Sequence, residues 1–555
     1  MKLYISTICV LVVNSWLAKG QSPVPLRPDI SITEVMTIHP GTLRIAYNNI
    51  DSSFYCATIS GNIYKVNLDV NGLGTDTLLY TKANHGIDRM QGMAFYDSCL
   101  YVSGNLQPDS PLTTGIIMRG KLLTGYQRNW TTVAQTVPYE TANAWDHYFS
   151  GLTVNLSGDT LFLCSGSRGD HGEVETRNGM YPGLRNLPVT SVILQIPTIA
   201  INLIIPNDSL ALDQAGLVLA RGIRNTFDFA YNAAGDLFGA ENSCDRDMED
   251  ELNWLRPGKY YGFPWMMGGA YNPQQFAGYD PTTDSLLNHN SLAWLNGAFH
   301  NDPSFPQIPT GLQLTMPCKN LGPDASFLRN SITGVTYNAA AIGDTIYSFT
   351  PHRSPLGLTF DRDSILGSDL RGNGFVLSYT RGDSTLNNAS PLLVPFNDKS
   401  EDLLMLKMEK DTADDTYLFH AYKIAEGFLE PVDAVLLDTN MYIIEFGFSG
   451  TESLWRINFP VFITSFNTLS KANNPVILVY PNPASNIVNF SFNSDIHEYY
   501  NLGIYDMYNR LIFFKDHINS KERFILNTSQ VEQGIYCWKL SGEFIKSGGR
   551  FAVMH

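Results

Sequence analysis

The densest group of chemically active side chains lies between Glu241 and Glu251. Six carboxylates fall within these eleven residues, and Asn242, Ser243 and Asn253 stand beside them. Carboxylates at this spacing repel one another unless a cation neutralises them, and Ca²⁺ prefers about six to eight oxygen ligands. The segment therefore suits a calcium site. The alternative is a solvated acidic loop, which runs of charge usually form.

An ordered set of motifs surrounds this segment. The central motifs are Gly222-Ile223-Arg224-Asn225, Ala240-Glu241-Asn242, Asp250-Glu251-Leu252-Asn253, Arg256-Pro257-Gly258 and Tyr261-Gly262-Phe263-Pro264-Trp265. Upstream motifs are Asp146-His147, Ser150-Gly151, Gly158-Asp159 and Gly166-Ser167-Arg168-Gly169-Asp170, and weaker ones are Pro355-Leu356-Gly357-Leu358, Gly374-Phe375-Val376, Arg381, Glu430-Pro431-Val432-Asp433 and Leu454-Trp455-Arg456-Ile457. Over most of residues 85–458 this order resembles the glucose/sorbosone dehydrogenase family. Its members are soluble six-bladed propellers that use pyrroloquinoline quinone (PQQ).

The resemblance implies catalytic roles for matching residues. His147, beside Asp146, would be the base that removes the proton of a sugar's anomeric hydroxyl, a task that suits an imidazole. Arg224 would face the quinone and its carboxylates, where a guanidinium stabilises developing negative charge. The neighbouring Asn225 and the more distant Arg381 would be further contacts to the cofactor.

The same resemblance implies metal ligands. The backbone carbonyls of Ser243 and Cys244 would hold the cofactor's Ca²⁺, which would polarise the quinone carbonyl that accepts hydride. Asp250 and Glu251 would be ligands of a nearby structural Ca²⁺.

The motif around His147 differs from the family pattern in length. Tyr148 and Phe149 both separate His147 from Ser150-Gly151, which is one residue more than in the family. A strand slipped by one residue would turn His147 to the opposite face, unless a β-bulge absorbs the extra residue. His171 and His352 are the alternative bases if His147 is turned away.

A polar turn followed by an apolar strand recurs along the chain and predicts the repeat that positions these motifs. Five markers of this pattern, separated by 61, 76, 139 and 65 residues, are Leu100, Leu161, Leu237, Val376 and Met441. Because 139 is about twice the other spacings, we expect one unmarked repeat between Leu237 and Val376 and six repeats in all. The pattern favours a six-bladed β-propeller that ends near Phe459. Unrelated hairpins in a sandwich are the alternative.

Composition agrees with an all-β protein of more than one domain. A chain of 555 residues is too long for one hydrophobic core. With 44% hydrophobic and 16% charged residues, it is also too apolar to be disordered. Aromatic residues at 12%, with 45 Gly and 29 Pro, favour short strands and tight turns. The formal charge of −16 argues against a nucleic-acid partner.

The beginning of the chain predicts secretion. Lys2 precedes the apolar run Leu3 to Val13, and Ala18-Lys19-Gly20 follows, so we expect a signal peptide over residues 1–20. The run is shorter than the roughly 20 residues of a membrane-spanning helix, and we expect no transmembrane segment. The six later cysteines are scattered without a C-x-x-C pair, which leaves zinc unsupported and any disulfide pairing unassigned.

We expect the propeller over residues 21–460, a linker over 461–476 and a small immunoglobulin-like β-sandwich over 477–555. The expected strands of this last domain are 477–480, 487–492, 500–505, 511–515, 524–526, 534–540 and 549–553. Its motifs include Val479-Tyr480-Pro481-Asn482-Pro483-Ala484-Ser485 and Gln533-Gly534-Ile535-Tyr536. They resemble the C-terminal sorting domain of type IX secretion cargo. The resemblance implies export by that machinery in a Bacteroidetes-type cell, removal of the domain, and release or attachment at the cell surface.

Three functional hypotheses follow. The first is a secreted PQQ- and Ca²⁺-dependent sugar dehydrogenase, which oxidises an aldose to its lactone and passes electrons to an unidentified acceptor. The second is a non-catalytic propeller at the cell surface that binds carbohydrate or protein, because a fold does not fix a function. The third is a hydrolase or lyase that uses the carboxylates with Ca²⁺, although the sequence shows no specific acid/base pair for it.

Overall fold

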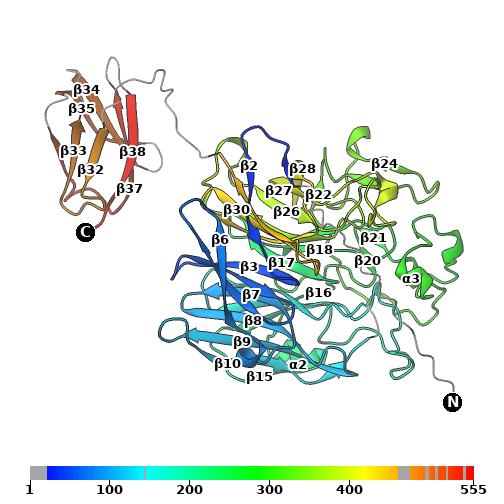
Figure 1. Cartoon of the computed structure of the whole chain (residues 1–555). Helices are drawn as coiled ribbons and strands as arrows, with labels where there is room; N and C mark the ends of the chain where they lie inside the picture. The colour runs from blue at the N-terminus through cyan, green and yellow to red at the C-terminus, as the bar shows by residue number, and fades with distance from the viewer. Residues whose placement is uncertain are drawn as a thin grey trace, which may run out of the picture. The chain divides into compact units, whose positions relative to one another are not determined.

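A computed structural model describes residues 22–142, 145–460, 476–493, 499–506, 510–519, 523–541 and 546–555. The chain divides into two compact units, Met1–Phe462 and Ile463–His555, each described by itself below (Figure 1). The expected signal peptide at 1–20 and residues 461–475 of the expected linker lie outside the described residues.

Six mainly antiparallel sheets, which we number as blades 1 to 6, form the first unit. Blade 1 contains β3 (Thr42–Asn48), β4 (Ser53–Thr58), β5 (Ile63–Leu68) and β6 (Gly74–Tyr80). Blade 2 contains β7 (Arg89–Tyr96), β8 (Cys99–Leu106), β9 (Leu112–Leu122) and β10 (Arg128–Thr136), with β11 (Tyr139–Glu140) and β15 (Leu203–Ile205) at its edges. Blade 3 contains β12 (Phe149–Val154), β13 (Thr160–Ser165), β14 (Val192–Pro197) and β16 (Val218–Arg221).

The other three blades follow in chain order. Blade 4 contains β17 (Thr226–Tyr231), β18 (Leu237–Glu241) and β19 (Glu251–Leu255). Blade 5 contains β25 (Pro355–Phe360), β26 (Gly374–Ser378), β27 (Asp402–Asp411) and β28 (Thr416–Glu426), joined by β1 (Val24–Pro25) and β22 (Lys319–Asn320). Blade 6 contains β29 (Pro431–Leu437), β30 (Asn440–Glu445), β31 (Ser453–Asn458) and β2 (Ser31–Thr37).

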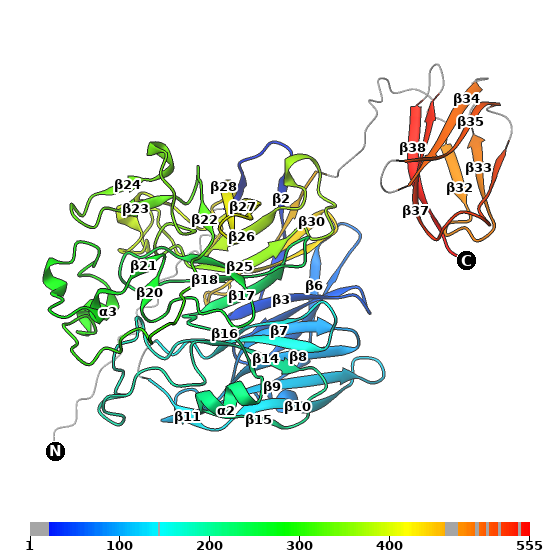
Figure 2. The same cartoon turned by 180° about the vertical axis from the view of Figure 1, so that it is seen from behind.

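The first strand of each blade lies against the first strand of the next. These contacts run from β3 to β7, β12, β17, β25 and β29, and from β29 back to β3. A closed ring of six sheets is a six-bladed β-propeller, which confirms the predicted all-β fold. Figures 1 and 2 show the blades from opposite sides.

Blade 6 joins the two ends of the propeller. Its outermost strand is β2, from the beginning of the unit, which pairs antiparallel with β31 from the end, Ser31 opposite Asn458 and Thr37 opposite Ser453. The Ser453 hydroxyl also donates to the Glu34 carboxylate at 2.8 Å. Ring closure therefore depends on strands from both ends of the unit.

The predicted number of repeats is right, but the predicted place of the unmarked repeat is wrong. The five markers lie in β8, β13, β18, β26 and β30, which are the second strands of blades 2 to 6. The unmarked blade is blade 1, where the second strand is β4. The long spacing between Leu237 and Val376 is a single step enlarged by an insertion over residues 256–354.

This insertion contains little regular structure. Its elements are β20 (Met266–Met267), β21 (Ala270–Tyr271), η1 (Pro273–Gln275), η2 (Pro281–Thr283), α3 (Leu292–Leu295), β22, β23 (Phe327–Arg329), β24 (Thr336–Asn338) and η3 (Ala340–Ile342). Most of them gather on one side of the ring, at the left of Figure 2. The remaining short helices are α1 (Lys82–His85), α2 (Ser209–Gln214), η4 (Ser368–Leu370) and η5 (Val394–Phe396). None of the described helices is long and apolar enough to cross a membrane.

Every innermost strand carries one extra residue near its start relative to the second strand of its blade. These register shifts lie at Thr42/Arg44, Met90/Gly92, Phe149/Leu152, Thr226/Asp228, Pro355/Leu358 and Pro431/Asp433. A bulge bends the strand and turns the residue before it in a new direction. Each blade thus has a bulge that redirects the residues at the beginning of its innermost strand.

One guanidinium and two carboxyl groups meet at the propeller axis. Arg44 of blade 1 donates from Nη2 to the Phe227 carbonyl of blade 4 at 2.5 Å, and its Nη1 lies 4.0 Å from Asp433 of blade 6. Asp228 of blade 4 and Asp433 are hydrogen-bonded to each other. Because blade 4 is a neighbour of neither blade 1 nor blade 6, the contacts of Arg44 with Phe227 and of Asp228 with Asp433 pass through the centre of the ring.

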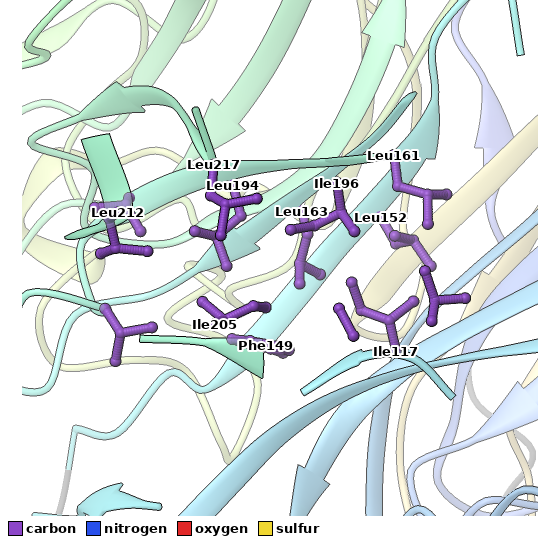
Figure 3. Close-up of a cluster of buried hydrophobic side chains, with 14 of the residues drawn as sticks. Ile117, Phe149, Leu152, Leu161, Leu163, Leu194, Ile196, Ile205, Leu212 and Leu217 are labelled. Atoms are coloured by element: carbon purple, nitrogen blue, oxygen red, sulfur yellow. The ribbon is translucent and has the colours of Figure 1, made fainter. Parts of the chain in front are cut away.

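Each pair of neighbouring blades encloses apolar side chains. Between blades 2 and 3, alternate residues such as Leu161 and Leu163 of β13 are fully buried against Ile117 of β9 and Phe149 (Figure 3). Alternation of apolar residues with period two places one face of each strand in such a core. The recurring sequence pattern of a polar turn followed by an apolar strand results from this alternation.

The second unit is a small β-sandwich. One sheet has the order β32 (Val476–Tyr480), β33 (Ile487–Asn493), β36 (Phe524–Asn527), and the other β35 (Leu511–Asn519), β34 (Tyr499–Tyr505), β37 (Gly534–Ser541), β38 (Lys546–Val553). Their inner faces share a core around Phe490, Trp538 and Phe551. The seven strands predicted from the sequence coincide with these seven, within a few residues at their ends.

Candidate functional site

Most of the predicted site residues lie around one cavity of about 210 Å³ in the propeller. Its lining is contributed by segments that precede the innermost strands of blades 3, 4 and 5 or follow their second strands. The lining residues are Trp145, His147, Arg224, Asn242, Ser243, Cys244, Asp245, Asp250, His352, Ser354, Thr380, Ser390 and Leu392. The structure therefore brings together His147, Arg224, Ser243, Cys244 and Asp250.

His147 lines the same cavity as Arg224 and lies just before a bulge in β12. Phe149 pairs with Ser165 and Leu152 with Leu163, so β12 uses three residue steps where β13 uses two. The bulge comes at Ser150-Gly151, after the extra residue of the His147 motif, and each of the other five blades has a bulge at the corresponding place in its innermost strand. His147 lies before the bulge, and its backbone N–H donates to the Ser167 carbonyl at 3.2 Å.

The His147 ring is a neutral imidazole. Its Nδ1 lies 3.0 Å from the Ser167 carbonyl oxygen, and since a carbonyl only accepts, Nδ1 carries the hydrogen. Burial, with the positive charge of Arg224 beside it, lowers the pKa of His147 to about 3. Nε2 is therefore unprotonated at neutral pH and able to accept a proton.

Arg224 is fixed by a buried carboxylate. Its Nη2 donates to Asp170 Oδ1 at 2.8 Å, its Nε to the Asp170 carbonyl at 2.8 Å, and its Nη1 to the Asn242 carbonyl at 3.1 Å. The other carboxylate oxygen of Asp170 contacts His171 Nδ1 at 2.9 Å. Burial opposes ionisation of Asp170, but the bond to His171 and the charge of Arg224 outweigh it and lower its pKa. The guanidinium is thereby held at the cavity wall.

The acidic segment is not a solvated loop. Glu241, Asp247, Asp250 and Glu251 are buried, and Asp245 and Glu249 are partly buried. This burial contradicts the alternative that the segment is a solvated acidic loop. The carboxylates are instead held by specific donors.

Asp250 joins two parts of the cavity wall. One of its oxygens accepts from the Ser243 N–H at 2.8 Å and the other from the Ser354 N–H at 2.7 Å. Burial raises the pKa of Asp250 to about 6 and that of the neighbouring Asp245 also to about 6. Asp250 thus ties the Ser243-Cys244 segment to the residues that precede β25.

Glu251 lies apart from the cavity, although it follows Asp250 directly. It stands opposite Glu241 in the β18–β19 pair, and its oxygens accept from the Gly268 N–H at 2.6 Å and the Asn253 side chain at 2.8 Å. Burial and the charge of Glu241 raise the pKa of Glu251 well above its usual value. Asn253 Oδ1 is buried there without a hydrogen-bond partner among the described residues. The structure therefore separates Asp250 from Glu251.

The other predicted site residues do not line the cavity. Arg381 forms a two-point ion pair with Glu401 at 2.9 and 3.0 Å. Asp146 accepts from the Ala142 N–H at 2.6 Å and so shapes the segment before His147. Asn225 donates to the Asn242 side chain at 3.0 Å and supports the wall from behind.

Several lining residues carry no sequence motif of their own. Among them are Asp245, which the sequence shows only as part of the acidic run, and Trp145, two residues before His147. Trp145, Tyr148, His352 and Ser354 all have positive φ, between 51° and 66°. Non-glycine residues rarely adopt this conformation, and strain of this kind concentrates at functional sites. No residue type in the sequence predicts this backbone strain.

The cavity wall can be compared with the cofactor that the resemblance implies. Calcium prefers oxygen ligands, and Asp250 offers a carboxylate whose pKa is raised by burial. The described residues include no group of three or more His, Cys, Asp or Glu that could hold a metal, so calcium would also need backbone carbonyls. Arg224 and His352 offer donors to an anionic group. The residues present thus fit a calcium ion and an adjacent anion.

Comparisons with known proteins give two results. No curated protein matches the sequence. The fold is similar to the PQQ-bound aldose sugar dehydrogenase of Streptomyces coelicolor, with 13% identity over 78% of this chain and 99% of that one and a TM-score of 0.43. The PQQ domain of pyranose dehydrogenase from Coprinopsis cinerea has 14% identity, covering 79% and 97%, with a TM-score of 0.46. The apo soluble aldose sugar dehydrogenase of Escherichia coli has 12% identity, covering 77% and 99%, with a TM-score of 0.45.

The second unit has a match of its own. Residues 478–552 match the family model of the secretion system C-terminal sorting domain. This match confirms the predicted sorting domain and indicates export to the cell surface or beyond.

Proposed function

We propose that the propeller is a PQQ- and Ca²⁺-dependent sugar dehydrogenase that oxidises an aldose to its lactone. The observation that carries the proposal is the neutral ring of His147 in one cavity with the fixed guanidinium of Arg224. A neutral imidazole and a cation at a fixed position are what removal of a hydroxyl proton beside a hydride acceptor requires. The motifs shared with the glucose/sorbosone dehydrogenase family support the same activity.

In this proposal each residue has a defined task. His147 Nε2 receives the proton of the anomeric hydroxyl, and Nδ1–H stays on the Ser167 carbonyl, which fixes the orientation of the ring. Arg224, held by Asp170, donates to negatively charged oxygens. Asp250 and the carbonyls of Ser243 and Cys244 would bind calcium. The quinone, when bound, supplies the hydride-accepting carbonyl.

The test is reconstitution of the purified chain with PQQ and Ca²⁺, followed by the absorbance of reduced quinone when a panel of aldoses is added. The wild type should reduce the quinone, and H147Q should bind PQQ without reducing it. His300, which is exposed and lies outside the cavity lining, provides the matched control H300Q, which should behave as the wild type. Absence of both PQQ binding and quinone reduction in the wild type would refute the enzyme hypothesis.

The second candidate is a surface propeller that binds carbohydrate or protein without catalysis. Two observations favour it. The cavity of about 210 Å³ is smaller than the roughly 300 Å³ at which ligand pockets usually begin, and Arg381 is engaged by Glu401. Calorimetric binding of an oligosaccharide without PQQ, abolished in R224A, would support this candidate.

We further propose that the type IX machinery recognises residues 477–555 and removes them during export. A chain that ends at residue 460 should remain inside the cell, and the full chain should appear outside it without the domain. Immunoblots of cell and medium fractions with an antibody to the propeller measure both outcomes. Equal export of the two chains would contradict this part of the proposal.

A further inference from the structure

A second imidazole, that of His352, lies in the wall of the same cavity. It belongs to the segment that precedes β25, and its φ is +66°, while Ser354 has a φ of +51°. Such strained conformations persist only where surrounding contacts fix them. The contacts of His352 therefore indicate why its backbone is held in this way.

Asp247 holds the ring of His352. His352 Nε2 lies 2.7 Å from Asp247 Oδ1, and the other carboxylate oxygen of Asp247 accepts a hydrogen bond from Arg329 Nε. The Asp247 N–H donates to the Leu286 carbonyl at 2.8 Å, and only 4% of Asp247 is exposed. A carboxylate only accepts, so Nε2 carries a hydrogen. The carboxylate anchors the ring from behind.

This anchoring leaves Nδ1 for another partner. Nδ1 of His352 has no hydrogen-bond partner among the residues that the structure describes, although His352 lines the cavity and 8% of its side chain is exposed. Burial alone would lower the pKa of His352, but the bond to Asp247 and the charges of Asp247, Asp250 and Asp245 outweigh it and raise the pKa. His147 is shifted in the opposite direction. Two imidazoles in one cavity whose pKa values are shifted in opposite directions are suited to different tasks.

We propose that His352, protonated on both ring nitrogens, is a ligand-contacting residue, which is held by Asp247 through Nε2–H and donates its Nδ1–H to an anionic oxygen of the bound molecule. The proposal rests on the proposed function only for the identity of that molecule, a quinone carboxylate. Its chemistry, a charge-assisted hydrogen bond to a carboxylate, does not depend on redox activity. Arg224 is the other donor in the wall, so two separated donors would orient one anion.

The first experiment measures PQQ affinity in the presence of Ca²⁺ by calorimetry. In H352Q the terminal amide nitrogen reproduces Nε2 and its contact with Asp247 but lacks an equivalent of Nδ1–H. Loss of one hydrogen bond to a charged group should raise the Kd about 10-fold or more. H300Q should leave the Kd unchanged. An unchanged Kd in H352Q would overturn the proposal.

The second experiment uses oxalate and the full chain with ¹³C-labelled histidine rings. The His352 resonance is assigned by its absence in H352Q, and oxalate is then added to the wild type at constant pH. The His352 signal should move in a saturable way, with that of His300 unaffected. If PQQ fails to bind the wild type but oxalate moves His352, the cofactor hypothesis falls and this proposal stands. A His352 signal that neither probe moves overturns the proposal.

Discussion

Asp228 and Asp433 share a hydrogen bond at the centre of the ring, which requires one proton between two buried carboxyl groups. Burial and the charge of Asp228 raise the pKa of Asp433 to about 8. Arg44 supplies a single positive charge nearby, 4.0 Å from Asp433. With one proton retained, one cation balances one anion on the propeller axis.

This pair predicts how propeller stability depends on pH. The folded state holds a proton that the unfolded Asp433 releases near its ordinary pKa of about 4, so folding stability should fall as pH rises from about 4 to about 8. One retained proton contributes a slope of at most about 1.4 kcal/mol per pH unit. Asp433→Asn should reduce the slope, whereas Asp363→Asn at the exposed surface should preserve it. Urea unfolding of both variants at several pH values measures the slopes, and identical slopes in Asp433→Asn and wild type would exclude the shared proton.

Glycines in the innermost strands provide a second prediction. A Cβ on Gly151 would lie 2.8 Å from the Phe227 carbonyl oxygen and 3.0 Å from that of Thr226, both backbone atoms of blade 4. Gly151→Ala should therefore force the two strands apart and cost about 1–3 kcal/mol. Gly120→Ala is the matched control, since its Cβ would meet the Trp130 side chain at 3.0 Å. Chemical denaturation should rank Gly151→Ala as the more destabilised variant, and the opposite rank would contradict this strand contact.

The neutral state of His147 is directly measurable. With its pKa lowered to about 3, the ring should not change protonation between pH 5 and pH 8. The ¹³Cε1 chemical shift of His147, assigned with H147Q, should remain constant over this range. A titration midpoint within it would mean that the ring is protonated too readily to act as described.

Removal of one partner of the Arg224–Asp170 ion pair should lower the stability of the fold. Arg224→Met removes the guanidinium paired with the fully buried Asp170, leaves His171 as the remaining partner of that charge, and should destabilise the fold by about 3–5 kcal/mol. The double variant Arg224→Met, Asp170→Asn removes that charge and should recover part of the loss. Denaturant midpoints of the single and double variants form a double-mutant cycle. Additive effects of the two substitutions would show that the pair is uncoupled.

The sequence reveals the strands because burial in a propeller alternates with period two. Leu100 and Leu161 follow polar turns, and this pattern located the second strands of five blades. Asp51-Ser52-Ser53-Phe54 before β4 carries the same pattern, so blade 1 was readable from its residues. The prediction of evenly spaced repeats wrongly placed the unmarked blade between Leu237 and Val376, because the insertion over residues 256–354 adds length without adding a blade.

The site was less readable because it depends on backbone geometry and on partners distant in the chain. The bulge between Phe149 and Leu152, which follows His147, has no signature residue. Burial of Asp247 depends on Arg329 and His352, about a hundred residues away in the insertion or at its end. Counting carboxylates identifies the segment but does not identify their partners.

The pairing of β2 with β31 also determines when this protein can become folded. Residues 31–37 have no partner in blade 6 until residues 453–458 have been synthesised, so five blades must wait as an open arc with an unpaired edge. An arc of this kind exposes strand edges to other chains, and contacts of such long sequence separation form slowly. Synthesis of residues 453–458, rather than of any earlier blade, is the event that permits closure of the ring.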